Sequence, residues 1–170
     1  PLPGGFLQVE AGNLDALDAV TGPKTAAVML ETVQGEGGVR PLPAAYLEGV
    51  ERLCRQKGIL LICDEVQAGL CRTGRFWAYQ HFGLTPDIVS CAKALANGLP
   101  MGAMLATDEA ARGFEAGSHA TTFGGGALVS AVAAKTVEIL RRDNLDARAA
   151  ALGAAFRDKA EALRQRLGGA

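Results

Sequence analysis

Two charged residues, Asp64 and Lys93, stand at the ends of apolar segments. Asp64 closes the apolar run that begins at Gly58, and Lys93 follows the segment 87–91 among alanines and leucines. Burial among apolar groups disfavours the charged form of a lysine and leaves a nucleophile that can form a Schiff base. We therefore expect Lys93 to be desolvated and reactive.

A third carboxylate, Glu31, ends the apolar segment 25–31 in the same way. Ligands of open parallel sheets bind outside the carboxyl ends of the strands, so Glu31, Asp64 and Lys93 are expected to converge on one pocket. A carboxylate beside a reactive lysine can keep a heterocyclic nitrogen protonated. Pyridoxal phosphate (PLP) needs both groups to act as an electron sink. Val66 and Gln67 are placed to contact the face and the hydroxyl of such a ring.

The pair Asp64-Glu65 has other interpretations. Four apolar residues followed by Asp-Glu also fit the Walker B pattern, in which carboxylates hold magnesium in an ATPase. An ATPase needs a G-x-x-x-x-G-K-[ST] loop, and the sequence has none, because the segment 22–25 lacks the upstream glycine and precedes a strand. Ordinary acids at a strand end remain the simplest alternative.

The elements that position these residues alternate between strands and helices. Apolar strands are expected at 25–31, 58–64 and 87–91, and a helix at 44–57 lies between Pro43 and Gly58. Such a crossover is right-handed and implies a parallel sheet covered on both faces. The strand 99–107 follows too closely for a crossover and is expected to be antiparallel. The fold class is therefore α/β, with further helices expected at 13–20, through 76–82, and at 108–114, 127–142 and 144–167.

Composition excludes several classes of partner. The chain has 170 residues, 49% hydrophobic content and a net charge of −1, which fits one globular domain without a basic surface for nucleic acid or membranes. We expect a small-molecule ligand. The four cysteines, Cys54, Cys63, Cys71 and Cys91, form no CxxC pair, which indicates reduced thiols, no metal site and a cytoplasmic location.

Four ordered segments resemble the class III PLP-dependent aminotransferases. They are LETVQGEGG (30–38), DEVQAGLCRTGR (64–75), TPDIVSCAKALANGLPMGA (85–103) and GSHATTFGG (117–125). Within that class they are most similar to the acetylornithine members. The resemblance runs from about residue 25 to 142, and it implies the large domain of a fold-type-I PLP enzyme.

The resemblance implies roles for individual residues. Lys93 would carry the cofactor as a Schiff base and shuttle the proton, and Asp64 would pair with the pyridine nitrogen. Glu36 would be the switch carboxylate that distinguishes the two amino substrates. The remaining cofactor and substrate contacts would come from Glu65, Val66, Gln67, Thr121 and Thr122, with Thr122 binding the cofactor phosphate of the neighbouring subunit in a homodimer.

The implied activity is transfer of the terminal amino group of N-acetylornithine to 2-oxoglutarate, a step of arginine biosynthesis. Ornithine, succinyl-diaminopimelate or GABA are alternative donors, since these enzymes share the motifs. Family members often continue Gly-Gly with Asn-Pro, where this chain has Gly126-Ala127.

The sequence is expected to be part of a longer protein. The family's phosphate loop, ring-stacking aromatic and substrate arginines fall outside the segment. We expect residues 1–142 to form the central and C-terminal part of the PLP-binding large domain, and residues 143–170 a helix leading toward a small domain. An inactive fragment, acting only as a partial cofactor-binding or dimerising module, is the second hypothesis.

Overall fold

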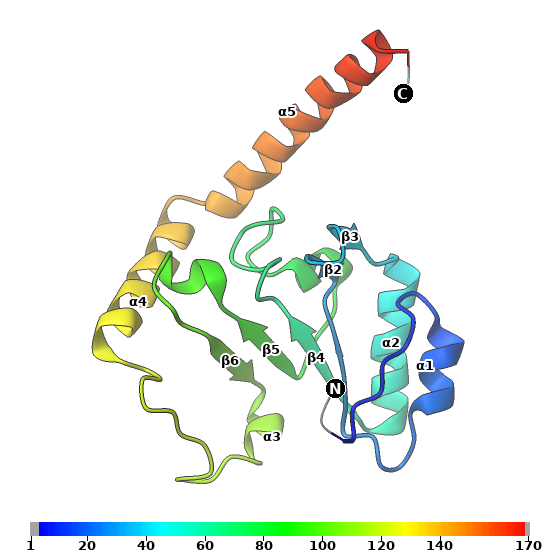
Figure 1. The fold of residues 1–170 in the computed structure, drawn as a ribbon, viewed down its shortest axis with the longest axis vertical. Coiled ribbons are helices and arrows are strands. Elements are labelled where there is room, and N and C mark those ends of the chain that lie inside the picture. The colour runs from blue at the N-terminus through cyan, green and yellow to red at the C-terminus, as the bar shows by residue number, and fades with distance from the viewer. Residues whose placement is uncertain (1–3, 169–170) are drawn as a thin grey trace.

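The computed structural model describes residues 4–168 and is built around a four-stranded sheet (Figure 1). Its strands are β1 (Ala27–Leu30), β4 (Leu60–Asp64), β5 (Ile88–Cys91) and β6 (Ala103–Ala106), in the order β1-β4-β5-β6. The first three are parallel, and β6 pairs antiparallel with β5. The mostly parallel sheet and the reversed last strand are both as the sequence predicted.

One face of the sheet is packed and the other is open. Leu61 and Cys63 of β4 are fully buried against helix α2 (Ala44–Lys57), since strand residues alternate between the two faces. On the opposite face Ile62, Asp64 and Ser90 are half-buried, and Met29 is 59% exposed. Helix α2 therefore covers the packed face, and the mostly parallel sheet flanked by helices agrees with the expected α/β class.

Helix α2 has the bounds that its flanking residues predicted. Pro43 precedes it, and Gly58 ends it in a left-handed conformation (φ 64°), which glycine adopts at little steric cost. Two of its basic side chains form hydrogen bonds with the segments next to it in space. Arg55 donates to both oxygens of Asp87 at 2.9 Å, just before β5, and Lys57 donates to carbonyl oxygens of Asp18 and Thr21 at the end of α1 (Leu14–Val20).

Two short strands, β2 (Val33–Gln34) and β3 (Arg40–Pro41), form a hairpin beyond the carboxyl end of β1. Two 3-10 helices follow the parallel strands: η1 (Ala78–Phe82) lies between β4 and β5, and η2 (Lys93–Ala96) follows β5. The helix expected through 76–82 is thus a single short 3-10 segment. It ends at Gly83 in a left-handed conformation.

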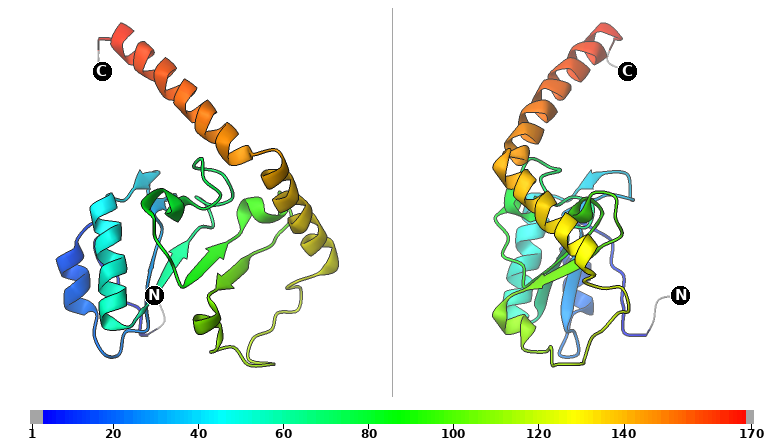
Figure 2. Two further views of the ribbon diagram at one scale, coloured as in Figure 1. Left: turned by 180° about the vertical axis from the view of Figure 1, so that it is seen from behind. Right: turned by 90° about the vertical axis from the view of Figure 1, so that its left-hand side faces the viewer.

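The last third of the chain is helical. After α3 (Asp108–Ala111), an exposed loop leads to α4 (Ala127–Arg142), which packs on η2 through a cluster that contains Leu95, Ala96 and Ala133. Helix α5 (Leu145–Arg166) then leaves the body of the molecule, as both views in Figure 2 show. Its apolar side remains exposed, with Phe156 at 74%. Among the helices of residues 4–168, none combines the length and apolar character needed to cross a membrane.

All four cysteines are buried and unpaired. Burial raises the pKa of Cys54 to about 11 and that of Cys63 to about 12. These two thiols therefore stay protonated at neutral pH and serve as small apolar core residues.

Candidate active site

Asp64 lies at the carboxyl end of β4, with its side chain on the open face of the sheet. Its Oδ1 atom accepts hydrogen bonds from the Val66 amide at 2.9 Å and from Ser90 Oγ at 3.1 Å. Within residues 4–168 no hydrogen bond reaches Oδ2. One carboxylate oxygen is thus fixed by the protein, and the other is left for a ligand.

Lys93 begins η2, two residues after the end of β5, and has a left-handed backbone with φ 44°. Few residues other than glycine adopt this region, so the conformation carries strain of the kind found at functional sites. The Nζ atom donates to Oε1 of Gln67 and lies 3.7 Å from Oε1 of Glu36. The Lys93 side chain is 49% exposed, so the expected desolvation is not supplied by the described residues.

The hairpin loop that carries Glu36 is held by Glu31. Oε2 of Glu31 accepts a hydrogen bond from the Gly35 amide at 2.9 Å. At Gly35 an added Cβ would come within 2.5 Å of the Gln67 amide group, so any larger residue would displace the Gln67 side chain. Glu31 therefore supports the loop on which Gln67 rests, and Glu36 itself is 92% exposed. The carboxyl ends of the strands converge as expected, with η2 and the hairpin at the same end of the sheet (Figure 1).

The Glu65 side chain points away from Asp64 and into the core. Its side chain is 1% exposed, and its two oxygens accept hydrogen bonds from the amides of Ala78 at 2.7 Å and Tyr79 at 2.8 Å. Successive strand residues point to opposite faces, so Glu65 turns into the core while Asp64 faces the site. Burial raises the pKa of the Glu65 carboxyl group. Its carboxylate anchors the start of η1, and this geometry gives no support to cofactor binding by the side chain.

Thr121 and Thr122 lie apart from this cluster. Both are in the exposed loop between α3 and α4, which runs away from η2 and the hairpin (Figure 1). In the described structure neither threonine forms a hydrogen bond with Lys93 or Asp64. The cluster consists of Glu36, Asp64, Gln67 and Lys93, with Val66 contributing its backbone amide.

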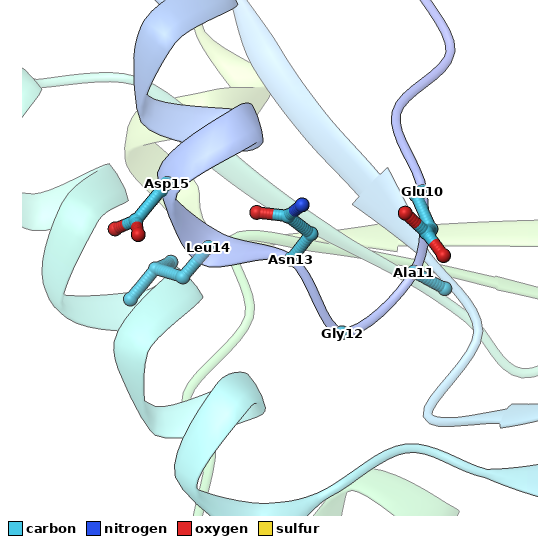
Figure 3. Close-up of a pocket in the computed structure, with 6 residues that line it drawn as sticks. All are labelled: Glu10, Ala11, Gly12, Asn13, Leu14 and Asp15. Carbon is cyan, nitrogen blue, oxygen red and sulfur yellow. The ribbon is translucent and has the colours of Figure 1, made fainter.

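A hollow elsewhere on the surface contains none of the candidate residues. It has a volume of about 410 Å³ and is lined by residues 10–15, where Asn13 caps α1 through a 2.9 Å hydrogen bond to Ala16 (Figure 3). In the part of the chain that the structure describes, no group of His, Cys, Asp and Glu side chains is arranged to hold a metal ion.

Sequence reasoning missed Ser90 as a partner of Asp64. The two residues are register partners on adjacent parallel strands, β4 and β5. The apolar pattern predicted both strands but not their register, so it could not show that Asp64 and Ser90 are neighbours. Ser90 lies three positions before Lys93 at a strand end, and its polar side chain within an apolar strand was the available signal.

The sequence profile described as aminotransferase class-III matches residues 7–167 of the chain. The chain belongs to this family. Class-III aminotransferases are PLP-dependent enzymes, and the conserved fold of the family accounts for the mostly parallel sheet described above.

Individual class-III aminotransferases are similar over most of the chain. An acetylornithine aminotransferase from Myxococcus xanthus is 49% identical over 142 residues, which are 84% of this chain and 35% of that protein. A structure of the ornithine aminotransferase from Toxoplasma gondii, with partial occupancy of PLP at its active site, matches with a TM-score of 0.89 and 40% identity. The acetylornithine aminotransferase from Elizabethkingia anophelis matches with a TM-score of 0.89 and 34% identity.

The chain spans less than half the length of these relatives. The matches cover 97% of this chain but 38% of the Toxoplasma chain, and 95% of this chain but 41% of the Elizabethkingia chain.

The residues of the cluster fit the ring side of PLP. Lys93 offers a primary amine, Asp64 offers an oxygen without a protein partner among residues 4–168, and the Gln67 amide lies against Lys93. These are the groups that a pyridine ring with an aldehyde and a hydroxyl would need. The candidate phosphate ligand, Thr122, lies outside the cluster.

Proposed function

We propose that this chain forms the lysine-bearing part of the active site of a PLP-dependent aminotransferase. The observation that carries the proposal is the meeting of Lys93, Gln67 and Glu36 at the end of the sheet where Asp64 closes β4. When bound, PLP supplies an electron sink for amino-group transfer. Family membership supports the same reaction class.

Each residue of the cluster has a distinct task in this proposal. Lys93 would hold the cofactor through Nζ and, once released from it, would carry the proton of the 1,3-transfer. Asp64 Oδ2 accepts the hydrogen bond of the protonated ring nitrogen, and its negative charge keeps the proton there. Gln67 hydrogen-bonds the ring hydroxyl, and Val66 packs against the ring.

We propose that the phosphate is held by a second copy of the chain. Thr122, with Thr121 beside it near the substrate, lies in an exposed loop that does not join the cluster of its own chain. A threonine hydroxyl and nearby backbone amides are suitable phosphate donors. The working enzyme would then be a homodimer in which each site uses residues of both subunits.

The proposed amino donor is N-acetylornithine and the acceptor is 2-oxoglutarate, which places the reaction in arginine biosynthesis. The 49% identity to the Myxococcus acetylornithine enzyme supports this choice. Ornithine is the second candidate, because the Toxoplasma ornithine enzyme has the same fold at 40% identity. Glu36 would act as the switch carboxylate between the two substrates.

Two further parts of the proposal rest on the sequence. Residues 1–142 would belong to the large domain, with residues 143–170 leading toward a small domain, and the enzyme would be cytoplasmic. The relatives are more than twice as long as this chain, so an inactive module that binds the cofactor in part is the alternative.

The test is formation of glutamate from 2-oxoglutarate and N-acetylornithine by the 170-residue chain supplied with PLP. Lys93→Ala is the inactive control, and Lys135→Ala, on the exposed surface of α4, is the matched lysine control. Faster turnover of ornithine would favour the second donor. No glutamate from any of these donors would contradict an active enzyme and favour the inactive module.

A further inference from the structure

Asp64 and Ser90 face each other across two parallel strands. They are register partners in β4 and β5, so their side chains project from the same, more open face of the sheet. Both are half-buried, and Ser90 Oγ lies 3.1 Å from Asp64 Oδ1. The serine is therefore a fixed neighbour of the carboxylate on a rigid element of the fold.

The hydrogen bonds to Asp64 are unequally divided between its oxygens. Oδ1 receives the Val66 amide at 2.9 Å and the Ser90 hydroxyl at 3.1 Å, and Oδ2 receives no donor from residues 4–168. The Val66 amide comes from the turn that follows the strand, whereas Ser90 comes from the neighbouring strand. Two donors from different directions restrain rotation of the carboxylate about the Cβ–Cγ bond better than one donor does.

We propose that Ser90 is a positioning residue for the cofactor-binding carboxylate. By donating its hydroxyl proton to Oδ1, Ser90 fixes the plane of the Asp64 carboxylate and keeps Oδ2 open for the protonated nitrogen of a pyridine ring. Ser90 acts through Asp64 and needs no contact with the cofactor. This role rests on the proposed function, because it presumes that Asp64 binds the ring.

Serine also suits this place for reasons of electrostatics. A hydroxyl donor stabilises a carboxylate without neutralising it, whereas an arginine or lysine would form an ion pair and compete with the ring nitrogen. Ser90 thus leaves the negative charge of Asp64 available to the ligand. A serine that merely filled space in the strand would have no effect on the orientation of Asp64.

The experiment compares Ser90→Ala, which removes the donor, with Ser90→Thr, which keeps a hydroxyl on the same carbon. Ser130→Ala, a half-buried serine of α4, is the matched control. The first readout needs no cofactor: the amide proton resonance of Val66 reports its bond to Asp64 Oδ1. The second readout is the dissociation constant of PLP with each chain, measured from the absorption of the bound cofactor.

Ser90→Ala is expected to shift the Val66 amide resonance and to weaken PLP binding about tenfold, the effect of one lost hydrogen bond to a charged group. Ser90→Thr should restore both, and Ser130→Ala should match the parent chain. If Ser90→Ala does not fold, Ser90→Cys keeps the volume with a much weaker donor and takes its place.

An unchanged Val66 resonance in Ser90→Ala would overturn the proposal, and so would a Ser90→Thr chain that behaves like Ser90→Ala in both readouts. Failure of the parent chain to bind PLP would instead contradict the proposed function. The Val66 resonance, measured without cofactor, would then still decide whether Ser90 holds Asp64.

Discussion

The Nζ atom of Lys93 lies 3.7 Å from Oε1 of Glu36, and this contact joins the first residue of η2 to the tip of the β2–β3 hairpin. The contact is exposed on both sides, with the side chains 49% and 92% accessible. Exposed pairs of this kind add little to stability and are easily broken by a competing partner. A weak, exposed contact of this kind is what the proposed switch role of Glu36 requires.

Replacement of Glu36 should alter substrate discrimination and leave stability unchanged. In Glu36→Ala, the ratio of kcat/KM between ω-amine and α-amine donors is expected to change about tenfold or more, while PLP affinity changes less than about threefold. The measurement is steady-state kinetics with N-acetylornithine and glutamate as donors. Glu109→Ala, which replaces another exposed acid, on α3, is the control. Equal losses in both half-reactions would argue against the switch role.

Glu65 should make stability depend on pH in the acid range. Burial raises its pKa in the folded state above the usual 4.5, so the folded chain holds this proton more tightly than the unfolded chain. By linkage, the contribution of Glu65 to the free energy of unfolding is largest below pH 4.5 and falls as pH rises through the raised pKa. In urea unfolding between pH 4 and 8, the free energy of unfolding of the parent relative to that of Glu65→Gln should fall as the pH rises.

If the parent instead became more stable than Glu65→Gln as the pH rises, the hydrogen bonds from the amides of Ala78 and Tyr79 would outweigh the effect of burial on the pKa of this carboxylate. Glu48→Gln, on the exposed surface of α2, provides the control for a carboxylate without burial.

The sequence predicted elements well where local signals define their ends. Pro43 and Gly58 bracket α2, and α4 has its expected bounds as well. The sequence did not predict features that depend on packing between distant parts of the chain. The helix expected through 76–82 is a short 3-10 segment, and its first amides are held by a buried carboxylate, Glu65, that follows β4. The roles of Glu65 and Ser90 depend on strand direction and register, which apolar runs leave open.

Gly74 should be needed for the start of α5. It has φ 93°, and an added Cβ would lie 3.0 Å from Cβ of Ala150, so both conformation and space require glycine. Gly74→Ala is expected to lower the free energy of unfolding by about 2 kcal/mol. Gly83→Ala, also left-handed but with open space around it, should cost only about 1 kcal/mol. Equal costs in urea unfolding would show that the contact with α5 contributes nothing.

Thr32 should be replaceable by valine with a gain in stability. It is 1% exposed, and within residues 4–168 its Oγ1 atom has no hydrogen-bond partner. A buried hydroxyl without a partner costs free energy that an isosteric methyl group avoids. Thr32→Val is expected to raise the free energy of unfolding by about 1 kcal/mol, whereas Thr107→Val, which removes the α3 cap, should lower it. A destabilised Thr32→Val chain in the same unfolding assay would reveal a partner for this hydroxyl.

The central claim, that Lys93 is the lysine that binds PLP, can be tested by chemical trapping. The chain is incubated with PLP and reduced with borohydride, and the labelled peptide is located by mass spectrometry, with Lys93→Ala and Lys135→Ala treated in parallel. We predict a label confined to the peptide containing Lys93, lost in Lys93→Ala and retained in Lys135→Ala. A label spread over several lysines, or one that survives in Lys93→Ala, would contradict the account.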